Sequence, residues 1–352
     1  MRSGIEVSTL KEPLGIIGVV TPWNFPIAIP AWKVAPALAS GNCVVLKPAE
    51  QSPGSAWALA EIISRSGLPA GAFNLVMGGA EAGATLTNHP DIDGVTFTGS
   101  SAVGTSVLAS ATANRARVQL EMGGKNPLVV LKDADLAVAW DCSIQGAFYS
   151  TGQRCTASSR LIVERAIHDE FVDGLIQRMK ALKIGNARVA GTQIGPVVDE
   201  KQLAKNLHYV TLGQDEGATL ACGGDLLALE TKGHYLSPAL FVDATPTMAI
   251  SRDEIFGPIA CVILADDYEH ALAIANDTPH ALSAGICTTS LKFANHFRRH
   301  GEAGLVMVNL ATAGIDYHVP FGGHKASSYG PREQGEQAIE FFTRGKTAYV
   351  AL

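Results

Sequence analysis

The chain has 352 residues, of which 47% are apolar and 17% charged, and its formal net charge is −6. This length is enough for more than one hydrophobic core, so we expect two domains. The acidic balance and the lack of a basic run argue against nucleic acid or an anionic membrane as a partner. No apolar stretch reaches the length of a membrane span, and the opening residues show no signal-peptide pattern.

The 6 cysteines are scattered without a C-x-x-C pair, and the 10 histidines are dispersed along the chain. Both patterns argue against a zinc site, and the first also argues against a disulfide framework. We therefore expect no metal and a protein of the reducing cytoplasm.

The first third of the chain alternates between apolar β-type runs and helical patterns. Strands are predicted over 14–20, 43–46, 73–77, 95–98 and 118–121, and helices over 28–39, 53–66, 80–86 and 102–113. This alternation predicts an α/β fold with a parallel, doubly wound sheet of Rossmann-like type.

A second alternation begins at Asn126. Strands are predicted over 128–131, 161–163, 259–264, 283–287 and 305–308, and helices over 135–149, 166–182, 200–215, 268–276 and 291–300. The polar, glycine-rich segment 217–238 is interpreted as a surface loop. The tail, 343–352, is interpreted as an edge strand, with simple fraying of the chain end as the alternative.

Four short motifs follow predicted strands of the first domain. They are Thr-Pro-Trp-Asn over 21–24, Lys-Pro-Ala-Glu over 47–50, Thr-Gly-Ser over 98–100 and Glu-Met-Gly over 121–123. In doubly wound sheets, ligands bind beyond the carboxyl ends of the strands. The motifs therefore predict a binding cleft lined by an amide, an ammonium, two carboxylates and a glycine turn.

Cys155 lies where a predicted helix meets a predicted strand, just after Gly152 and among small residues. A free cysteine taken alone is more often a small buried hydrophobe than a nucleophile. Glu121 changes that interpretation, because it ends a strand and precedes two glycines that let the backbone approach a ligand. A thiol nucleophile and a carboxylate base are the parts of a two-step covalent mechanism.

The stretches EMGGKNP and GQRCTASSRLIV resemble the aldehyde dehydrogenase superfamily, as do PWNFP, LKPAE, FTGS, EIFGP and VPFGGHKASSYGPREQG. The resemblance implies an NAD-binding domain over 14–123, a catalytic domain over 124–325, and a return to the cofactor domain over 326–352 that includes an oligomerisation strand. Residues 1–13 correspond to a remnant of the oligomerisation arm. Relatives carry a long segment before the position of Met1, so the cofactor domain is expected to be incomplete and to expose apolar surface.

The resemblance also implies that Cys155 forms a hemithioacetal and then a thioester with an aldehyde. Asn24 and the Cys155 N–H would stabilise the oxyanion, and Glu121 would take a proton from the attacking water. The alternatives are a turn or helix-cap role for Asn24 and a solvated surface charge for Glu121.

Glu333 is a candidate proton relay by the same resemblance. Its alternative is a surface ion pair with Arg332 or Lys325. Arg154, directly before the nucleophile, can hold the far carboxylate of a semialdehyde through two parallel hydrogen bonds, or else pair with an internal acid.

The nearest approach to a dinucleotide fingerprint is the glycine turn that begins at Gly99 and opens a predicted helix. N–H groups at a helix N-terminus can bind phosphate, although such a turn alone is a weak signal. Glu50 can accept the ribose hydroxyls of NAD and would repel a 2′-phosphate, so NAD is favoured, with NADP as the alternative. The candidate cofactor-binding residues are Thr21, Trp23, Lys47, Glu50, Gly99, Ser100, Gly104, Met122, Glu254 and Phe256. For Glu254 and Phe256, a helix-start acid and a core aromatic are the alternatives.

Together these features predict NAD-dependent oxidation of a carboxylated semialdehyde, with α-ketoglutarate semialdehyde as the expected substrate. We expect a homo-oligomer, either a dimer or a tetramer. Two alternatives stay open: a CoA-acylating semialdehyde dehydrogenase, whose relatives typically lack a carboxylate at the position of Glu121, and an inactive truncated fragment that only binds.

Overall fold

The computed structural model describes residues 4–351, and the chain divides into two compact units. Unit 1 comprises Met1–Met122, Asp316–Gly322 and Ser328–Leu352, and unit 2 comprises Gly123–Ile315 and Gly323–Ser327. The expected boundaries differ from this division mainly at residues 316–322, which belong to unit 1, and also at Gly123 and residues 326–327, which belong to unit 2. Phe321 accounts for the main difference, because its backbone pairs with Glu333 in both directions and its ring contacts Trp32.

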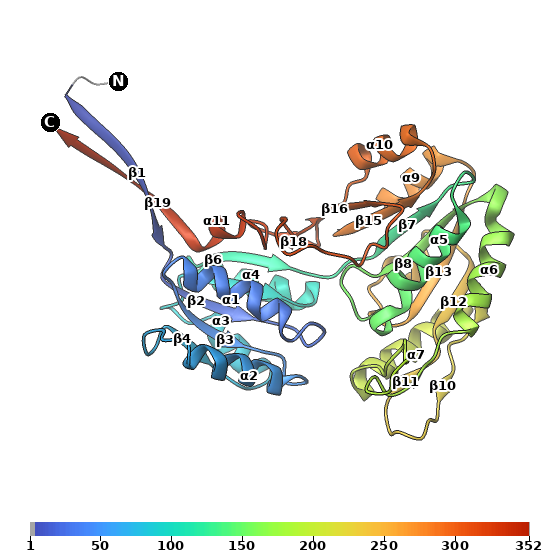
Figure 1. The fold of residues 1–352 in the computed structure, drawn as a ribbon, viewed down its shortest axis with the longest axis horizontal. Coiled ribbons are helices and arrows are strands. Elements are labelled where there is room, and N and C mark those ends of the chain that lie inside the picture. Colours follow the sequence, from blue (N-terminus) through green and yellow to red (C-terminus); the bar gives the residue numbers. More distant parts are fainter. Residues whose placement is uncertain (1–3, 352) are drawn as a thin grey trace. The chain divides into compact units, whose positions relative to one another are not determined.

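Unit 1 is built on a six-stranded sheet with the order β18-β6-β5-β2-β3-β4 (Figure 1). Its strands are β2 (Ile16–Val20), β3 (Cys43–Lys47), β4 (Phe73–Leu75), β5 (Gly94–Thr98), β6 (Arg117–Glu121) and β18 (Ser328–Tyr329). Its helices are α1 (Ala28–Ala39), α2 (Pro53–Ser64), α3 (Ala80–Thr87), α4 (Ser101–Ala113) and α11 (Ala338–Phe342). Neighbouring strands are parallel except for β18, which is antiparallel to β6.

Apolar side chains leave the sheet of unit 1 on both faces. Ile17 of β2 belongs to the core that includes Val34 of α1, whereas Val95 of β5 belongs to the core that includes Val107 of α4. Because the strand order reverses between β2 and β5, a topological switch point lies there. The predicted doubly wound fold is confirmed.

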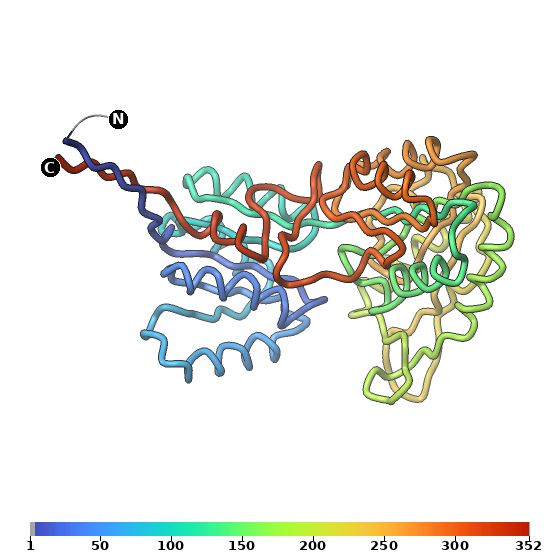
Figure 2. The backbone as a smooth tube through the Cα atoms, turned by 45° about the horizontal axis from the view of Figure 1, so that its top comes forward, coloured from blue at the N-terminus to red at the C-terminus, as the bar shows by residue number. Residues whose placement is uncertain are grey.

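The strands β1 (Ile5–Pro13) and β19 (Thr343–Ala351) form an antiparallel ribbon of their own. Each residue of β1 has a partner in β19, from Ile5 opposite Ala351 to Pro13 opposite Thr343. The two strands run together away from the sheet of unit 1 (Figure 2). The edge-strand interpretation of the tail is therefore confirmed over fraying.

Unit 2 is built on a seven-stranded sheet with the order β16-β15-β7-β8-β13-β12-β9. Its strands are β7 (Asn126–Val130), β8 (Ser158–Glu164), β9 (Thr219–Cys222), β12 (Ala239–Ala244), β13 (Ile259–Ala265), β15 (Ser283–Cys287) and β16 (Leu305–Val308). Its helices are α5 (Leu136–Ser143), α6 (His168–Lys180), α7 (Glu200–Asp215), α8 (Ala249–Arg252), α9 (Tyr268–Asn276) and α10 (Leu291–His300). Two short pairs complete it: β10 (Leu226–Leu227) with β11 (Tyr235–Leu236), and β14 (His280–Ala281) with β17 (His324–Lys325).

Two predictions for unit 2 are wrong. The helix expected over 135–149 ends as an α-helix at Ser143 and continues as a π-helix over Ile144–Phe148 and a 3₁₀ turn over Tyr149–Gly152. The loop expected over 217–238 contains β9, β10 and β11, and β9 joins the main sheet by pairing with β12.

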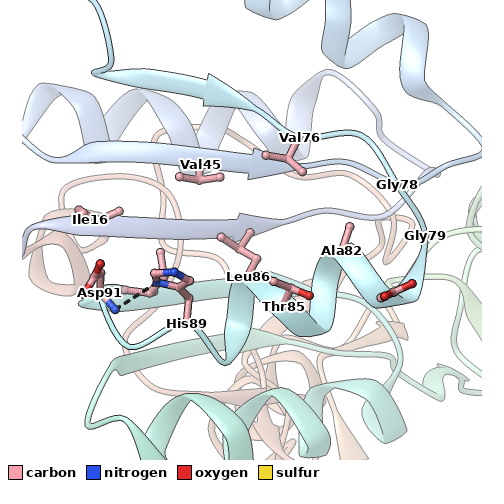
Figure 3. Close-up of a pocket in the computed structure, with 12 residues that line it drawn as sticks. Ile16, Val45, Val76, Gly78, Gly79, Ala82, Thr85, Leu86, His89 and Asp91 are labelled. Atoms are coloured by element: carbon pink, nitrogen blue, oxygen red, sulfur yellow. Dashed lines mark hydrogen bonds between the residues drawn. The ribbon is translucent and has the colours of Figure 1, made fainter.

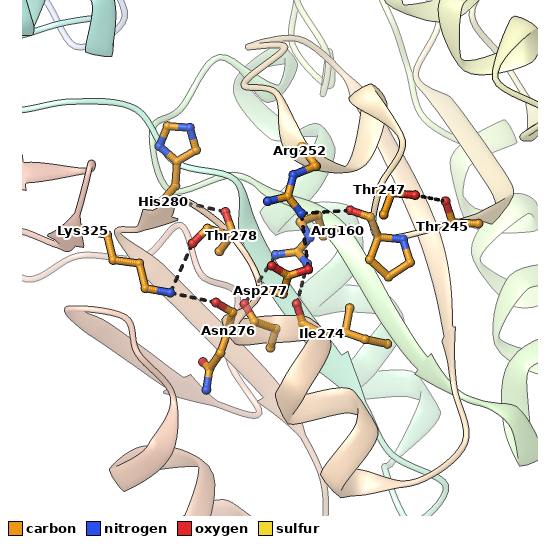
Figure 4. Close-up of polar contacts among 12 residues, drawn as sticks. Arg160, Thr245, Thr247, Arg252, Ile274, Asn276, Asp277, Thr278, His280 and Lys325 are labelled. Carbon is orange, nitrogen blue, oxygen red and sulfur yellow. Dashed lines mark hydrogen bonds and ion pairs between the residues drawn. The ribbon is translucent and has the colours of Figure 1, made fainter.

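The C-terminus of α9 is fixed by two cations (Figure 4). The guanidinium of the buried Arg160, on β8, donates to the carbonyls of Ile274 at 2.5 Å and Ala275 at 3.4 Å. Lys325 donates to the carbonyl of Asn276 at 2.8 Å. These bonds satisfy carbonyls that the end of a helix leaves free, and they place positive charge where the helix dipole favours it.

None of the helices in the described part of the chain combines the length and apolar character needed to cross a bilayer.

Candidate active site

Most of the expected site residues of unit 1 follow the carboxyl ends of four neighbouring strands. Backbone hydrogen bonds join these ends in pairs: Thr21 N–H donates to the Lys47 carbonyl at 3.2 Å, and Gly99 N–H donates to the Glu121 carbonyl at 3.0 Å. Because β6, β5, β2 and β3 are adjacent, the four motifs lie along one edge of the sheet.

Trp23 and Asn24 lie in the bend between β2 and α1. The N-cap of α1 is Ile27, without a side-chain hydrogen bond, so Asn24 does not cap this helix. The bend leaves the side-chain amide at the carboxyl edge of the sheet, and its oxyanion role stays a prediction.

The glycine turn after β5 is shaped by close packing. Ser100 is the N-cap of α4, and its hydroxyl accepts from the N–H of Val103 at 3.4 Å. A Cβ on Gly104 would lie 2.5 Å from the Met122 sulfur, so only glycine lets α4 approach the end of β6 this closely. The turn therefore presents the N-terminus of a 13-residue helix at the switch point, where a phosphate can bind.

Lys47 and Glu50 follow β3 and interact electrostatically. Burial lowers the pKa of Lys47, and the Glu50 carboxylate opposes that fall. Glu50 itself is exposed and lies beside Gly79, where a Cβ would be 2.6 Å from its Oε2 atom. The hydroxyls of Thr21 and Thr98 are buried and make no hydrogen bond to another described residue. The helix N-terminus, the two hydroxyls and the ammonium can donate to phosphate and ribose oxygens, and the carboxylate can accept from ribose hydroxyls, so the set fits a dinucleotide.

Glu121 is buried, with only 2% of its surface exposed, so the solvated-charge alternative is wrong. Ser328 of the adjoining strand β18 donates to its Oε2 atom at 2.6 Å. Burial raises the pKa of Glu121 well above its usual range, and the nearby Glu333 carboxylate adds to the rise. The raised pKa makes the Glu121 carboxylate a stronger base than a solvated one, which suits a group that takes a proton from water.

Glu333 is also buried, and its partner is Lys33 of α1, with which it forms a buried ion pair. The alternative of a surface ion pair is wrong, because Glu333 is only 3% exposed and the cation paired with it is the buried Lys33. Trp32 Nε1 donates to the second Glu333 oxygen at 2.8 Å. Lys33 also donates to Thr96 Oγ1 at 2.8 Å.

Lys33 was missed from the sequence, although a signal was present. Ile29, Lys33 and Ala37 are spaced four residues apart on one face of α1, and all three are buried. A lysine in the middle of an apolar helical stripe needs a buried anion, and this pattern could have prompted a search for one.

In unit 2, Cys155 follows a strained turn. Ser150, Thr151 and Gly152 are three consecutive residues with φ of 55°, 59° and 63°. The left-handed region is costly for a β-branched residue such as Thr151, whose hydroxyl is held by the Gly195 carbonyl at 3.1 Å. Cys155 is half-buried and belongs to none of the described hydrophobic cores. The interpretation as a small core hydrophobe is therefore wrong.

Asn126, at the start of β7, fixes the loop that carries Cys155. Its side-chain amide donates to the Cys155 carbonyl at 2.7 Å and the Ala157 carbonyl at 3.0 Å, and its oxygen accepts from Ser283 N–H at 3.0 Å. Gly124 allows this approach, because a Cβ there would lie 2.7 Å from the Cys155 carbonyl.

Arg154 donates to the Ser150 hydroxyl at 2.8 Å and, at 3.4 Å, to the Gln145 carbonyl. Among the residues described, no acid lies within ion-pair distance of its guanidinium. Burial lowers the pKa of Arg154, and charge on the Cys155 thiol opposes the fall, so guanidinium and sulfur interact electrostatically. The alternative of an internal ion pair is wrong.

Glu254 and Phe256 lie in the loop between α8 and β13. Glu254 follows the end of α8, so it is not a helix-start acid, and Phe256 is half-buried rather than a core residue. Arg154, Glu254 and Phe256 line one cavity of about 10 Å³ with Gly124 and Gly152. The structure therefore brings three of the expected site residues of unit 2 together.

A separate groove of about 650 Å³ opens on unit 1 beside α3 (Figure 3). Ile16, Val45, Val76 and Leu86 give it an apolar lining, and none of the expected site residues line it. Within residues 4–351, no group of three His, Cys, Asp or Glu side chains is placed to hold a metal ion.

Comparison with known proteins agrees with these features. The model of the aldehyde dehydrogenase family matches residues 1–348. The chain belongs to the aldehyde dehydrogenase family. The α-ketoglutaric semialdehyde dehydrogenase of Bacillus subtilis (strain 168) is 46% identical over 345 residues, which cover 97% of this chain and 71% of that protein. The 2,5-dioxopentanoate dehydrogenase of Saccharolobus solfataricus is 42% identical, over 98% of this chain and 72% of that protein.

Solved aldehyde dehydrogenases have the same fold. The betaine aldehyde dehydrogenase of Staphylococcus aureus in complex with NAD⁺ matches with a TM-score of 0.97 and 32% identity, over 99% of this chain and 72% of that one. An aldehyde dehydrogenase of Bacillus cereus matches with a TM-score of 0.96 and 38% identity, over 100% of this chain and 71% of that one. The predicted family, fold and enzyme class are confirmed: this aldehyde dehydrogenase is an oxidoreductase.

Proposed function

We propose that this aldehyde dehydrogenase oxidises a short carboxylated semialdehyde to the acid with NAD, and that α-ketoglutarate semialdehyde is the first substrate to test. Supporting observations come from both units. They are a half-buried thiol beside a guanidinium with no acidic partner among the described residues, and a buried carboxyl whose pKa is raised. Two of the similar proteins carry this substrate in their names.

The roles follow from the chemistry of each group. The Cys155 thiolate forms a C–S bond with the aldehyde carbon, while the Asn24 amide and the Cys155 N–H donate to the resulting oxyanion. Bound NAD supplies a hydride acceptor, and the hemithioacetal becomes a thioester on Cys155. Glu121 then takes a proton from a water molecule, and the water oxygen forms a C–O bond with the thioester carbon. The C–S bond breaks with the Cys155 thiolate as the leaving group, and the carboxylic acid is released. Glu333, paired with Lys33, is proposed as the relay that carries the proton onward.

The proposed NAD-binding residues are those after β2, β3 and β5, with Met122, Glu254 and Phe256. Glu50 favours NAD over NADP, because its exposed carboxylate can accept two ribose hydroxyls and would repel a 2′-phosphate.

A screen of semialdehydes of graded length tests this function, with NADH formation as the measurement. Wild-type protein should turn over carboxylated semialdehydes, and Cys155→Ala should abolish NADH formation. Product analysis with and without coenzyme A distinguishes hydrolysis from CoA acylation. Hydrolysis gives the free acid whether or not coenzyme A is present. Acyl-CoA as the product, or NADH formation that survives Cys155→Ala, would overturn the proposal.

Arg154 is the proposed substrate residue. Arg154→Ala should lower kcat/KM for a carboxylated semialdehyde by about a hundredfold, because two charge-assisted hydrogen bonds are lost. An uncharged aldehyde of similar length should lose much less. The control is Arg165→Ala, at an exposed arginine of unit 2 paired with Asp266. Equal losses for the two aldehydes would remove Arg154 from substrate selection.

We also propose that the ribbon of β1 and β19 pairs with a second copy of the chain. Apolar side chains on it are exposed, including Leu10 at 52% and Tyr349 at 67%. The six free cysteines support the cytoplasm as the compartment, since thiols persist in reducing conditions.

A further inference from the structure

Helix α7 presents a polar stripe to the loop that carries Glu254 and Phe256. Gln202, Lys205, Asn206 and Tyr209 are spaced as the buried face of a helix would be, where apolar side chains are usual. Each of them points its polar end toward residues 253–257. This arrangement needs an explanation beyond helix packing.

The side chains of the stripe hold four consecutive loop residues. Gln202 donates to the carbonyls of Ile255 at 2.8 Å and Phe256 at 3.1 Å. Lys205 donates to the Glu254 carbonyl at 2.7 Å. Tyr209 donates to the Asp253 carboxylate at 3.0 Å.

The buried Asn206 completes the contact. Its oxygen accepts from Gln202 at 2.9 Å, which orients the donor that reaches the loop. A Cβ on Gly257 would collide with the Asn206 amide, so the glycine allows the loop backbone to pack closely against α7.

The loop needs such restraint because of its own backbone. Phe256 has a φ of 62°, a left-handed conformation that is costly for an aromatic residue. Short helix α8 ends at Arg252, and its last backbone bond runs from the Asp253 N–H to the Ala249 carbonyl at 2.8 Å. The conformation of residues 253–257 therefore depends on contacts from α7.

The same restraint sets the position of the Glu254 carboxyl group. It accepts from Gly124 N–H at 3.2 Å and occupies the space that a side chain on Gly123 would fill. Its burial there raises the pKa of Glu254, and the Lys205 ammonium opposes the rise. A shift of the loop would move this carboxyl group and the Phe256 ring together.

We propose that the polar stripe of α7 is a clamp that positions Glu254 and Phe256 for the nicotinamide half of NAD. The proposal rests on the proposed function, in which these two residues bind the cofactor. The residues of the stripe are positioning residues, since they act through the loop.

Gln202→Met tests the clamp, because it removes both donors at nearly constant volume. The matched control is Gln214→Met, the same change at an exposed position of the same helix. In protein without cofactor, hydrogen exchange of amides 254–257 should accelerate by about tenfold in Gln202→Met, since a hydrogen bond of this kind contributes roughly 1–1.5 kcal/mol. The Kd for NAD⁺ should rise by about tenfold, for the same reason. Gln214→Met should match wild type in both.

Three further variants separate positioning from general stability. Tyr209→Phe removes one oxygen atom and should also weaken NAD⁺ binding, which keeps the test open if Gln202→Met fails to fold. Lys205→Arg should retain NAD⁺ affinity, whereas Lys205→Met should lose it at an unchanged melting temperature.

Unchanged exchange at residues 254–257, or equal Kd values for NAD⁺ in Gln202→Met and Gln214→Met, would overturn the clamp. Wild-type protein that binds NAD⁺ without oxidising any aldehyde would overturn the proposed function alone, because the clamp is measured by exchange and binding.

Discussion

Glu121 and Glu333 are two buried carboxyl groups of unit 1 with different partners. Glu333 has the Lys33 ammonium and the Trp32 indole N–H, whereas Glu121 has the Ser328 hydroxyl. Burial, together with the negative charge of Glu333, favours the neutral form of Glu121. Glu121 can therefore take up a proton at a higher pH than a solvated carboxyl group, whereas Glu333 has a cation beside it.

Glu121→Gln should lower acid formation by about 10²–10⁴-fold, because the amide cannot accept a proton from water. In wild type, activity should rise with pH through the raised pKa of Glu121, since only the carboxylate acts as a base. A pH profile of kcat for both proteins measures this. A variant with wild-type turnover would exclude Glu121 as the base.

Glu121→Gln should raise the stability of the protein at high pH, although it lowers the activity. Because folding raises the pKa of Glu121, its neutral form stabilises the fold at acidic pH, and that contribution is lost as pH rises through the raised pKa. The neutral glutamine should therefore match wild type at low pH and exceed it at high pH. Urea unfolding at both ends of the range measures the difference, and a variant less stable than wild type at high pH would contradict it.

Lys33→Met should destabilise unit 1 by about 3–5 kcal/mol, because it leaves the Glu333 carboxylate buried without its cation. The control is Arg165→Met, which breaks a 2.6 Å pair with Asp266 in which both side chains are exposed. Such a surface change should cost at most about 1 kcal/mol. The double variant Lys33→Met/Glu333→Gln should recover part of the loss in urea unfolding. Equal effects of the two single substitutions would contradict the prediction.

The site was predictable at residue scale wherever a residue type limits the chemistry. Cys155 and Glu121 stood out as a pair, because a thiol nucleophile and a carboxylate base together are the parts of a two-step covalent mechanism. Lys33 and Asn126 did not, because their partners, such as Glu333 and Ser283, are 157 to 300 residues away in sequence. Only the fold brings such pairs together.

At the scale of elements, the turn over Ser150–Gly152 sets the position of Cys155, the proposed nucleophile. Gly152→Ala should cost about 1–3 kcal/mol, because φ is 63° there and a Cβ would collide with the Gly257 carbonyl. It should also lower kcat by displacing Cys155. The control is Gly54→Ala in α2, where no atom lies within 4 Å of the added Cβ and the change should be neutral or stabilising. Thermal unfolding and single-turnover NADH formation measure both effects; a wild-type rate in Gly152→Ala would contradict the prediction.

For helices with a clear apolar periodicity, the sequence predicted both the first and the last residue, as α7, α9 and α10 show. Each begins at a side-chain cap, namely Asp199, Asp267 and Ser290. The secondary-structure predictions failed where the backbone conformation departs from the one that the apolar periodicity indicates. The π-helix and the left-handed turn before Cys155 keep apolar periodicity in sequence, yet they end the α-helix at Ser143. The sequence did not predict the strand β12, whose place in the sheet depends on its pairing with β9 and β13.

At the scale of the whole molecule, the ribbon of β1 and β19 determines the predicted oligomeric state. Val7 and Tyr349 lie opposite each other on it, and both are largely exposed. Val7→Lys/Tyr349→Lys should convert an oligomer to a monomer, because paired charges oppose strand association. Light scattering after gel filtration measures the mass, with Leu291→Lys on α10 as the control. A monomeric wild type, or an unchanged mass in the double variant, would contradict the prediction.

Exposed apolar surface on unit 1 was also expected from the sequence. Ile16 and Val76 of the groove beside α3 are exposed by more than a third of their surface, which agrees with that expectation. The rest of the fold at this scale, including the return of 316–322 to unit 1, depends on pairings such as Phe321 with Glu333 that no local pattern encodes.

Ile5 and Ala351 face each other across the ribbon, so the first and last strands end roughly 5 Å apart. A turn of about two to five residues could join them, as in a β-hairpin. New ends could then be opened in the exposed segment 228–233 between β10 and β11. A circularly permuted chain of this kind would keep every strand of both main sheets. Its N- and C-termini would lie in unit 2 instead of unit 1.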